Sequence, residues 1–436
     1  MMTSTRFFLL NISILLFSSG VNAQFKNVLI DSTLSSGGRY PCEPSITINY
    51  KNPDNMVVGA AVDNVYTTFD GGATWQKSKM RSPHGVWGDP VLISDFSNNH
   101  YYFHLSDPTG KNWESEELLD RIVVQKSKDG GKSWDAGESI GHNPPKDQDK
   151  EWAVTDRKGN LYATWTQFDK YGSDDPECKS VILYSKSSNG SKWSKPVVIS
   201  QAAGDCKDDD NTTQGAVPTV TNDGKVFVTW AKQGYIYLDR SFDGGDTWLT
   251  NDIAIIEQAG GWNIEIPGID RSNGMPMMVS DNTKKTSSGA LYLTWADQIN
   301  GENDTDIWLM RSFNYGDNWT QAFRINDDDL GKQQFLPSLT VDGVTGYLYV
   351  LFYDRRNYDD EQTDVYLAYS IDNGGTFKNV KISETPFTPK NDVFFGDYIN
   401  VAAYNGKIAA VWTRMDEGKT SIWTTVIKHE ELEKIK

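Results

Sequence analysis

Histidine side chains are few in this chain and unevenly placed. Three of the five stand in polar segments beside strand-like runs: His84 in "SPHGVWGDP", His104 in "YYFHLSD" and His142 in "GHNPPKDQDKEW". Because an imidazole transfers protons near neutral pH, a group of three suits acid–base catalysis. We predict His84 and His104 as an acid–base pair, with His142 as a third member. His100 and His429, in a turn and in the C-terminal tail, are expected to have no catalytic role.

Arginine and aromatic side chains supply the second group of candidates. A guanidinium fork suits a carboxylate or sulfate, and an aromatic ring can stack on a sugar or give a proton. For Arg355 and Arg356 the alternative is an ion pair that ties loops together, with Asp354 and Asp397 as partners. The predicted substrate-binding residues are Arg271, Arg355, Arg356, Arg414, Trp87, Tyr171 and Tyr353.

A short polar turn that ends in an aromatic residue recurs along the chain and indicates what must position these side chains. Copies read "TTFDGGATW", "SKDGGKSW", "SFDGGDTW", "SFNYGDNW" and "SIDNGGTF", with a degenerate copy, "SSNGSKW". The turns start at residues 68, 127, 186, 241, 312 and 370. Each interval of roughly sixty residues holds the same order of short β-patterned runs, and four strands per unit are typical of propeller blades.

Counting the units predicts one all-β domain, a seven-bladed β-propeller over residues 24–436. The innermost strands are expected to begin near Glu43, Asp89, Glu151, Ala216, Pro276, Leu336 and Tyr398. The last unit lacks a fourth strand, whereas the N-terminal segment "FKNVLID" nearly repeats the outer strand "FKNVKIS" of blade six. We therefore expect the N-terminal strand to complete blade seven and close the ring.

The repeated turn resembles the Asp box, or BNR turn, of sialidases and related propellers, over nearly all of residues 24–436. In such a turn the aspartate hydrogen-bonds the backbone, the glycines adopt the unusual dihedral angles, and the aromatic ring packs on the neighbouring strand. The resemblance implies a structural role for the box. We therefore expect Asp70, Asp129, Asp243 and Asp372 not to be catalytic.

Strand alternation assigns the loops to two faces of the ring. The Asp boxes join the third and fourth strands of a blade, so they share a face with the turns between first and second strands. Loops that precede first strands, or join second to third strands, lie on the opposite face, where propellers place their sites around the axis. His84, His104 and His142 all fall on that face, in one sector of the ring.

The start of the chain predicts export. Arg6, the apolar run "FFLLNISILLF" and "VNA" ending at Ala23 read as a secretory signal over residues 1–23, too short to span a bilayer. The mature protein is expected to be a periplasmic or secreted monomer. Its net charge of −17 argues against nucleic-acid binding, but it allows an anionic glycan where basic residues gather.

The cysteines are expected to be structural. Cys178 and Cys206 are the more plausible disulfide pair, which would leave Cys42 free. No Cys/His spacing resembles a zinc site, so no metal-binding residues are predicted and the sequence requires no cofactor. Binding of Ca²⁺ among the acidic loops stays open.

We predict β-elimination on uronic-acid sugars as the function. The reaction needs a base for the C5 proton, an acid for the departing C4 oxygen and a cation that holds the carboxylate. The seven blades and the pair of histidines on blade two resemble the propeller ulvan lyases of marine bacteria and the related ulvan-oligosaccharide dehydratase. The resemblance implies a sulfated, ulvan-type substrate that is either cleaved or dehydrated. The lyases also use a Tyr and an Arg, and blade three offers neither beside His142.

Two other functions remain open. The Asp boxes, and "GRYP" at Arg39, are similar to features of sialidases, so an exo-acting glycoside hydrolase that uses Tyr398 and Glu265 is an alternative. The other alternative is a non-catalytic glycan-binding propeller. It would use stacking aromatics but would not need convergent histidines.

Overall fold

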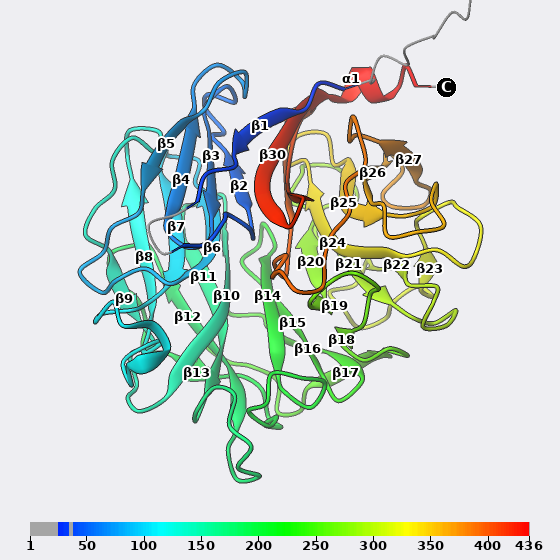
Figure 1. Ribbon diagram of the computed structural model, residues 1–436. Helices are drawn as coiled ribbons and strands as arrows, with labels where there is room; N and C mark the ends of the chain where they lie inside the picture. Colours follow the sequence, from blue (N-terminus) through cyan, green and yellow to red (C-terminus); the bar gives the residue numbers. More distant parts are fainter. Residues whose placement is uncertain (1–24, 35–37, 436) are drawn as a thin grey trace, which may run out of the picture.

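The computed structural model describes residues 25–34 and 38–435, and the expected signal segment lies outside them. The described residues form seven four-stranded sheets around a central axis, with a two-stranded hairpin beside them (Figure 1). The predicted all-β, seven-bladed arrangement is therefore confirmed. No helix in the described part of the chain is long and apolar enough to cross a membrane.

Blades one to six each use four consecutive strands, numbered outward from the axis. Blades one to four comprise β2 (Ser45–Ile48), β3 (Met56–Ala60), β4 (Asn64–Thr68) and β5 (Gln76–Lys79); β6 (Gly88–Ser94), β7 (His100–Leu105), β8 (Ile122–Ser127) and β9 (Glu138–Ile140); β10 (Asp147–Thr155), β11 (Leu161–Phe168), β12 (Ser180–Ser187) and β13 (Val197–Val198); β14 (Gln214–Val220), β15 (Val226–Lys232), β16 (Tyr235–Ser241) and β17 (Ile253–Glu257). Blades five and six comprise β20 (Met277–Ser280), β21 (Leu291–Asp297), β22 (Asp306–Ser312) and β23 (Phe323–Arg324); β24 (Gln334–Val341), β25 (Leu348–Asp354), β26 (Asp364–Ser370) and β27 (Lys378–Lys381). Two short helices, η1 (Asn112–Glu114) and α1 (His429–Leu432), and the hairpin of β18 (Asn263–Ile264) and β19 (Ser272–Asn273) complete the fold.

The N-terminal strand closes the ring, as expected. Blade seven consists of β28 (Asn400–Tyr404), β29 (Lys407–Asp416), β30 (Lys419–Lys428) and β1 (Val28–Asp31). The first strand of the chain, β1, pairs with β30 with Val28 opposite Thr424, and Figure 1 shows the blue strand beside the red one. The ring is thus closed by a sheet that joins the first described strand to the last three strands.

The Asp boxes have the structural role that the resemblance implied. Asp70 accepts hydrogen bonds from the Thr74 backbone N–H, over 3.0 Å, and from the Thr74 hydroxyl, over 2.6 Å. Asp129, Asp243 and Asp372 bind their own turns in the same way. Gly72 has a φ of 91°, and a Cβ there would lie 2.7 Å from Val426 of the next blade. The turns therefore pack neighbouring blades together, and the carboxylates of these aspartates are used in hydrogen bonds within the turns.

The core lies between the blades, so both faces of most strands are buried. Four second strands each carry an almost fully buried tryptophan: Trp165, Trp230, Trp295 and Trp412. Such a ring contributes roughly 3–5 kcal/mol to stability by comparison with alanine. Burial on both faces also encloses polar side chains that lie near the ends of these strands.

Cys178 and Cys206 form the expected disulfide, across 28 residues of sequence, and Cys42 is free and buried. Opening a loop of this length enlarges the unfolded ensemble. The double variant Cys178→Ser/Cys206→Ser is therefore expected to lose about 3 kcal/mol of unfolding free energy in urea denaturation. Reductant should destabilise the wild type by the same amount and leave the variant unchanged. Equal stability of the oxidised wild type and the variant would contradict this expectation.

Candidate active site

The first strand of each blade lines the axis. The backbone conformation at the start of this strand determines which side chains point to the centre of the ring. In blades two, three, four and six the pairing with the second strand shifts near that start, as in a β-bulge. Residues with positive φ accompany the shifts: Asp89 at 49°, Lys150 at 53°, Gly215 at 72° and Leu336 at 50°. Glu43, just before β2, has a φ of 53°. For residues other than glycine this backbone is strained, and such strain is often concentrated at functional sites.

These strand starts bring charged side chains together in what we name the axial cluster. Its members are Glu43, Asp89, Asp149, Lys150, Glu151, Asp208, Arg271 and Asp397. Blades one, two, three and seven supply six of them from strand starts. Asp208 and Arg271 belong to the loops that lead into blades four and five. The cluster therefore holds six carboxyl groups against two cations.

Asp397 is the point at which the two cations meet. Lys150 Nζ and Arg271 Nη2 both contact Asp397 Oδ2, and Arg271 Nε donates to Asp397 Oδ1 over 2.8 Å. Lys150 Nζ also lies 3.4 Å from Asp89 Oδ2, and Arg271 Nη1 donates to Asp208 Oδ2 over 2.9 Å. Buried charges are tolerated when they are paired in this way. The network therefore fixes both cations at the axis.

Glu43 lies beside Asp397 across the junction of blades one and seven. Its Oε1 accepts a hydrogen bond from the Asp397 backbone N–H over 3.2 Å. The close approach depends on Gly396, where φ is 99° and a Cβ would lie 2.8 Å from Glu43 Cγ. A larger residue at this position would push the two strands apart.

Burial and like charge keep several carboxyl groups protonated. Burial raises the pKa of Glu43, and the charge of Asp89 is the next cause. Burial also raises the pKa of Asp149 and of Glu151. Neither oxygen of Glu151 has a hydrogen-bond partner among the described residues. An uncharged carboxyl is the form that such surroundings favour, because two cations cannot offset six carboxylates.

Asp397 has the opposite pKa shift. Burial opposes its ionisation, but the charges of Lys150 and Arg271 outweigh burial and hold its pKa below the usual range. Acidic side chains of opposite protonation therefore lie in one small volume. That pattern is typical of sites that transfer protons and stabilise charge.

Arg271 and Asp89 are the most exposed members of the axial cluster, with 33% and 15% of their side-chain surface exposed. Glu43 and Asp397 are buried beneath them, and the Asp397 side chain keeps 4% of its surface. Within residues 25–34 and 38–435 no group of three or more His, Cys, Asp or Glu side chains is arranged to hold a metal ion.

A row of aromatic side chains extends from the cluster over blades three and two. Tyr171 donates to Asp208 Oδ2 over 2.7 Å, and its ring stacks on that of Trp113 with centroids 5.7 Å apart. Trp113 meets Trp87 edge-on, also at 5.7 Å, and the Arg39 guanidinium lies 4.8 Å from the Trp87 ring. We name Trp87, Trp113 and Tyr171 the aromatic row. Trp87 and Tyr171 were predicted to bind substrate; Trp113, in η1, was missed.

Two of the predicted histidines form a separate group that we name the rim cluster. Arg121 Nη1 donates to His84 Nδ1 over 3.3 Å, and His142 Nε2 lies 3.4 Å from Asp120 Oδ2. Asp120 and Arg121 are also ion-paired with each other. Burial, followed by the charge of Arg121, lowers the pKa of His84, so its imidazole is neutral at pH 7. The rim cluster therefore pairs a neutral imidazole with a guanidinium.

His104 is not available to a substrate in this structure. It is fully buried in β7, with Nδ1 2.7 Å from the Leu105 carbonyl oxygen and Nε2 3.2 Å from Gln125 Oε1. Burial lowers its pKa to about 4. His104 is enclosed because both faces of this second strand are covered by neighbouring blades.

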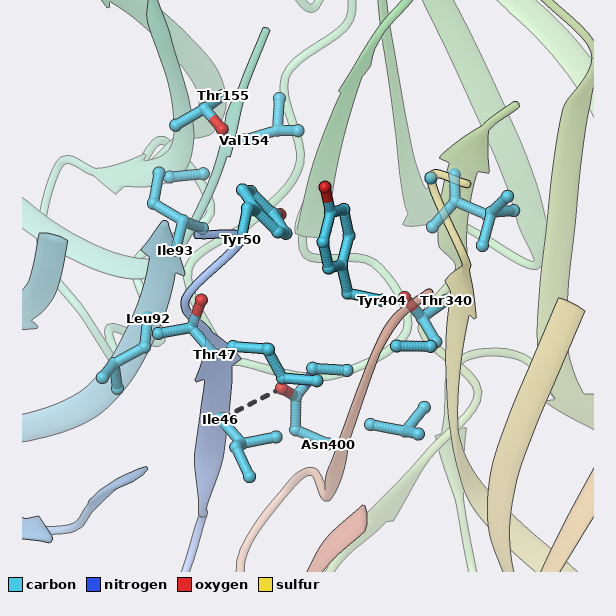
Figure 2. Close-up of a pocket in the computed structure, with 18 of the residues that line it drawn as sticks. Ile46, Thr47, Tyr50, Leu92, Ile93, Val154, Thr155, Thr340, Asn400 and Tyr404 are labelled. Atoms are coloured by element: carbon cyan, nitrogen blue, oxygen red, sulfur yellow. Dashed lines mark hydrogen bonds between the residues drawn. The ribbon is translucent and has the colours of Figure 1, made fainter. Parts of the chain in front are cut away.

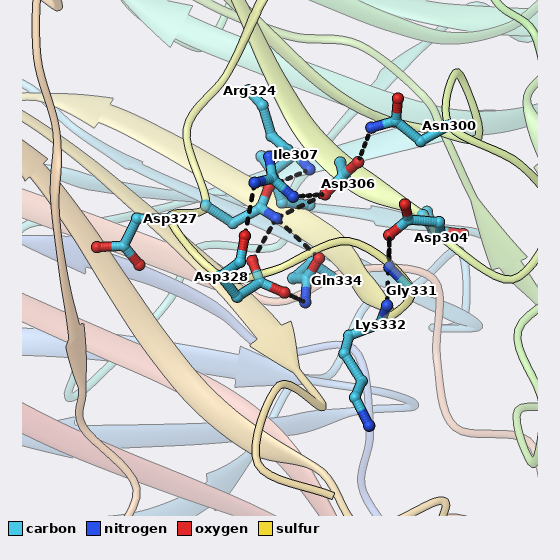
Figure 3. Close-up of polar contacts among 12 residues, drawn as sticks. Asn300, Asp304, Asp306, Ile307, Arg324, Asp327, Asp328, Gly331, Lys332 and Gln334 are labelled. Carbon is cyan, nitrogen blue, oxygen red and sulfur yellow. Dashed lines mark hydrogen bonds and ion pairs between the residues drawn. The ribbon is translucent and has the colours of Figure 1, made fainter. Parts of the chain in front are cut away.

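The predicted arginines do not converge, since only Arg271 reaches the axis. Arg356 binds Asp354 at 2.7 Å, which is the ion-pair alternative considered from the sequence. Arg356 also contacts Asp327 and Asp328, which belong to a polar network between blades five and six. In that network Asn326 donates to Asp306 Oδ1 over 2.7 Å. Figure 3 shows Gln334 beside Asp328, to which it donates over 2.9 Å. The side chain of Arg356 is thus held by structural contacts.

Arg355, Arg414 and Tyr353 also have structural partners. Arg355 is buried and donates to the Pro267 carbonyl oxygen over 2.7 Å. Arg414 binds Asp416 at 2.6 Å on blade seven. Tyr353 has no exposed surface and donates to the Thr413 carbonyl oxygen over 2.6 Å. The structure therefore gives Tyr353 no face for a substrate, and it places Arg355 and Arg414 away from the axial cluster.

The two hydrolase candidates considered from the sequence belong to different elements. Tyr398 follows Asp397 at the axis and donates to the Pro90 carbonyl oxygen over 3.3 Å. Glu265 lies in the segment between β18 and β19. The carboxyl groups of the axial cluster were missed as catalytic candidates, although Glu43, Asp89 and Glu151 had been recognised as strand starts. The sequence signal for this cluster was an acidic residue at three of the seven expected starts of the innermost strands.

The axis is closed at the Asp-box face. Tyr50 stacks on Phe96 with centroids 4.5 Å apart and faces Tyr404 at 4.9 Å. Arg157 reaches across to the carbonyl oxygens of residues 282 and 343. Behind these side chains lies a cavity of about 260 Å³, shown in Figure 2, whose described lining contains no carboxyl group or imidazole. This end of the axis therefore offers no acid–base pair of carboxyl or imidazole groups.

Comparisons with known proteins support the fold alone. Neither a protein-family model nor a curated protein matches the sequence. A protein of unknown function from Dyadobacter fermentans is 11% identical, with a TM-score of 0.51 over 94% of this chain and 99% of its own. The GH93 α-L-arabinofuranosidase of Fusarium graminearum, solved with arabinobiose, is 12% identical, with a TM-score of 0.50 over 93% and 98%. The NanB sialidase of Streptococcus pneumoniae is 10% identical, with a TM-score of 0.49 over 86% and 84%.

Proposed function

We propose that this protein is a glycoside hydrolase whose catalytic centre is the axial cluster. One observation carries the proposal: Glu43 and Asp89 both adjoin the Lys150–Asp397 ion pair, Glu43 through the Asp397 backbone N–H and Asp89 through Lys150 Nζ. Burial, followed by the charge of Asp89, raises the pKa of Glu43. Glycosidic bond cleavage needs one protonated and one ionised carboxyl group. The arabinofuranosidase of similar fold is a glycan-acting propeller, which agrees with this proposal.

In the proposed reaction Glu43 gives its proton to the departing glycosidic oxygen as the bond to the anomeric carbon breaks. The Asp89 carboxylate stabilises the positive charge that develops on that carbon. Water then supplies the hydroxyl of the product, and its other proton returns to Glu43. Lys150 Nζ lies 3.4 Å from Asp89 Oδ2 and holds that side chain at the axis. Asp397 and Arg271 hold the floor of the site in one arrangement.

The test is a panel of nitrophenyl glycosides and natural glycans incubated with the purified chain. New reducing ends or free nitrophenol, without new ultraviolet absorbance from an unsaturated sugar, are expected. The Glu43→Gln variant should lose activity on natural glycans but keep it on dinitrophenyl glycosides, whose leaving group needs no proton. Loss on both kinds of substrate would contradict the acid role of Glu43.

The pH profile should report Glu43 directly. An acid with a raised pKa is protonated below that pKa, so kcat/KM on natural glycans is expected to fall as the pH rises through it. The limb should be absent for the wild type and for Glu43→Gln on a dinitrophenyl glycoside, whose leaving group needs no proton. Asp149→Asn should keep the limb on natural glycans, although burial raises the Asp149 pKa as well. If the alkaline fall in kcat/KM on natural glycans disappeared only in Asp149→Asn, Asp149 would be the group that protonates the leaving oxygen. That result would contradict the proposal.

β-Elimination on a uronate at the rim cluster is the second candidate. It is favoured by the neutral His84 imidazole, which can take the C5 proton, beside the Arg121 guanidinium, which can hold the carboxylate. His142 is the candidate acid for the departing oxygen. Absorbance from an unsaturated uronate, lost in His84→Gln but kept in Glu43→Gln, would favour this reaction over hydrolysis. That result would make the lyase or dehydratase predicted from the sequence the favoured function.

A further inference from the structure

A hollow of about 520 Å³ lies between blades one and two, on the same face as the axial cluster. Its described lining includes Arg39, Asp63, Arg81, Trp87 and Asn112. Neither the axial cluster nor the rim cluster contributes a side chain to this lining. The hollow is therefore a separate feature of the functional face, which we name the arginine hollow.

Positive charge gathers in the arginine hollow, although the whole chain has a net charge of −17. Arg39 and Arg81 are both exposed. Asp63, the acidic residue of this lining, is bridged by Lys79 through both carboxylate oxygens, at 2.8 and 2.9 Å. The lining therefore holds two guanidinium groups and one carboxylate, and that carboxylate is bridged by a lysine. Guanidinium groups suit carboxylates and sulfates.

The aromatic row joins the arginine hollow to the axial cluster without a break. Arg39 lies over Trp87, Trp87 meets Trp113, and Trp113 stacks on Tyr171. The Tyr171 hydroxyl then binds Asp208, which belongs to the axial cluster. Trp113 is 60% exposed, which is unusual for a tryptophan with two aromatic neighbours. An exposed ring held by other rings is a preformed stacking surface at little entropic cost.

We propose that the arginine hollow binds an anionic sugar ring, a uronate or a sulfate ester, and that Trp113 stacks on the sugar that links this ring to the cleaved bond. The inference rests on the proposed glycan hydrolysis and names its substrate class: an acidic oligosaccharide cleaved next to a neutral ring. The charge distribution is the physical reason. Six carboxyl groups against two cations disfavour a charged ring at the axis, whereas the arginine hollow attracts one.

Binding can be measured without turnover by affinity gel electrophoresis of the Asp89→Asn chain. Polygalacturonate tests the uronate, dextran sulfate tests the sulfate ester, and dextran is the neutral control. Retardation by one of the acidic glycans, weakened by salt, is expected, together with little retardation by dextran. Trp113→Ala and Arg81→Gln should each weaken it about tenfold, which corresponds to 1.4 kcal/mol.

Matched controls separate this site from general effects. Phe313→Ala removes an exposed ring, and Lys192→Gln removes an exposed charge, both in the Asp-box turns on the other face. Neither should change retardation, and thermal melting should show that all four variants are folded. Equal retardation of Trp113→Ala, Arg81→Gln and the parent chain would overturn the proposal, as would stronger binding to dextran. Acidic-glycan binding by an otherwise inactive wild type would instead refute hydrolysis and leave this site standing.

Discussion

Replacing Asp89 by asparagine is expected to lower kcat/KM on the cleaved glycan by about 10³-fold or more, a loss of roughly 4 kcal/mol of transition-state stabilisation. Asparagine keeps the shape of the side chain but cannot carry the charge that balances a cationic transition state. The same change removes a cause of the raised Glu43 pKa, so the alkaline limb of any residual activity should move to lower pH. Initial rates over a range of substrate concentrations and pH values measure both effects.

The control for this variant is a matched change away from the axis. Asp246 is an exposed aspartate whose only ion pair is with Lys186, within the described residues. Asp246→Asn should keep full activity. Asp89→Asn should melt near the wild-type temperature, because Lys150 stays paired with Asp397. A folded Asp89→Asn chain with more than a tenth of wild-type activity would remove Asp89 from the reaction.

The fold could be predicted because the features that define it are local. An Asp box needs only a few consecutive residues to form its turn, as the hydrogen bonds from Thr74 to Asp70 show. Six copies at a regular interval then fix the number of strands per blade. Closure by the N-terminal strand could also be predicted, because "FKNVLID", which contains β1, nearly repeats "FKNVKIS", which contains β27. These signals do not depend on contacts between distant segments.

The axial cluster could not be read in the same way. Lys150 and Asp397 are 247 residues apart, and Arg271 and Asp397 are 126 apart. Such contacts result from ring closure and from the bulges at the strand starts, and no local sequence pattern predicts them. Strand alternation also failed to show that His104 is enclosed. Alternation separates the two faces of a strand, but both faces are buried in a propeller.

Asp397→Asn is expected to have the largest effect on stability. Asp397 is the carboxylate that Lys150 and Arg271 share, and its side chain is 4% exposed. Without its charge the buried Lys150 and the partly exposed Arg271 would lose the carboxylate that they share, so the free energy of unfolding should fall by about 3–5 kcal/mol. Asp169→Asn, which breaks the exposed pair with Lys146, should cost at most about 1 kcal/mol. Urea denaturation at pH 7 compares the two.

The pH dependence of this loss identifies its origin. Because the folded pKa of Asp397 is depressed, its stabilising contribution is fully present above the unfolded carboxyl pKa, at about 4, and is lost as the pH falls towards the folded value. The gap in unfolding free energy between wild type and Asp397→Asn should therefore narrow below pH ~4. The double variant Lys150→Met/Asp397→Leu should recover part of the loss at pH 7, since it removes one buried cation together with the shared carboxylate. A gap that stays constant with pH, or a double variant less stable than Asp397→Asn, would mean that packing rather than charge holds the axis together.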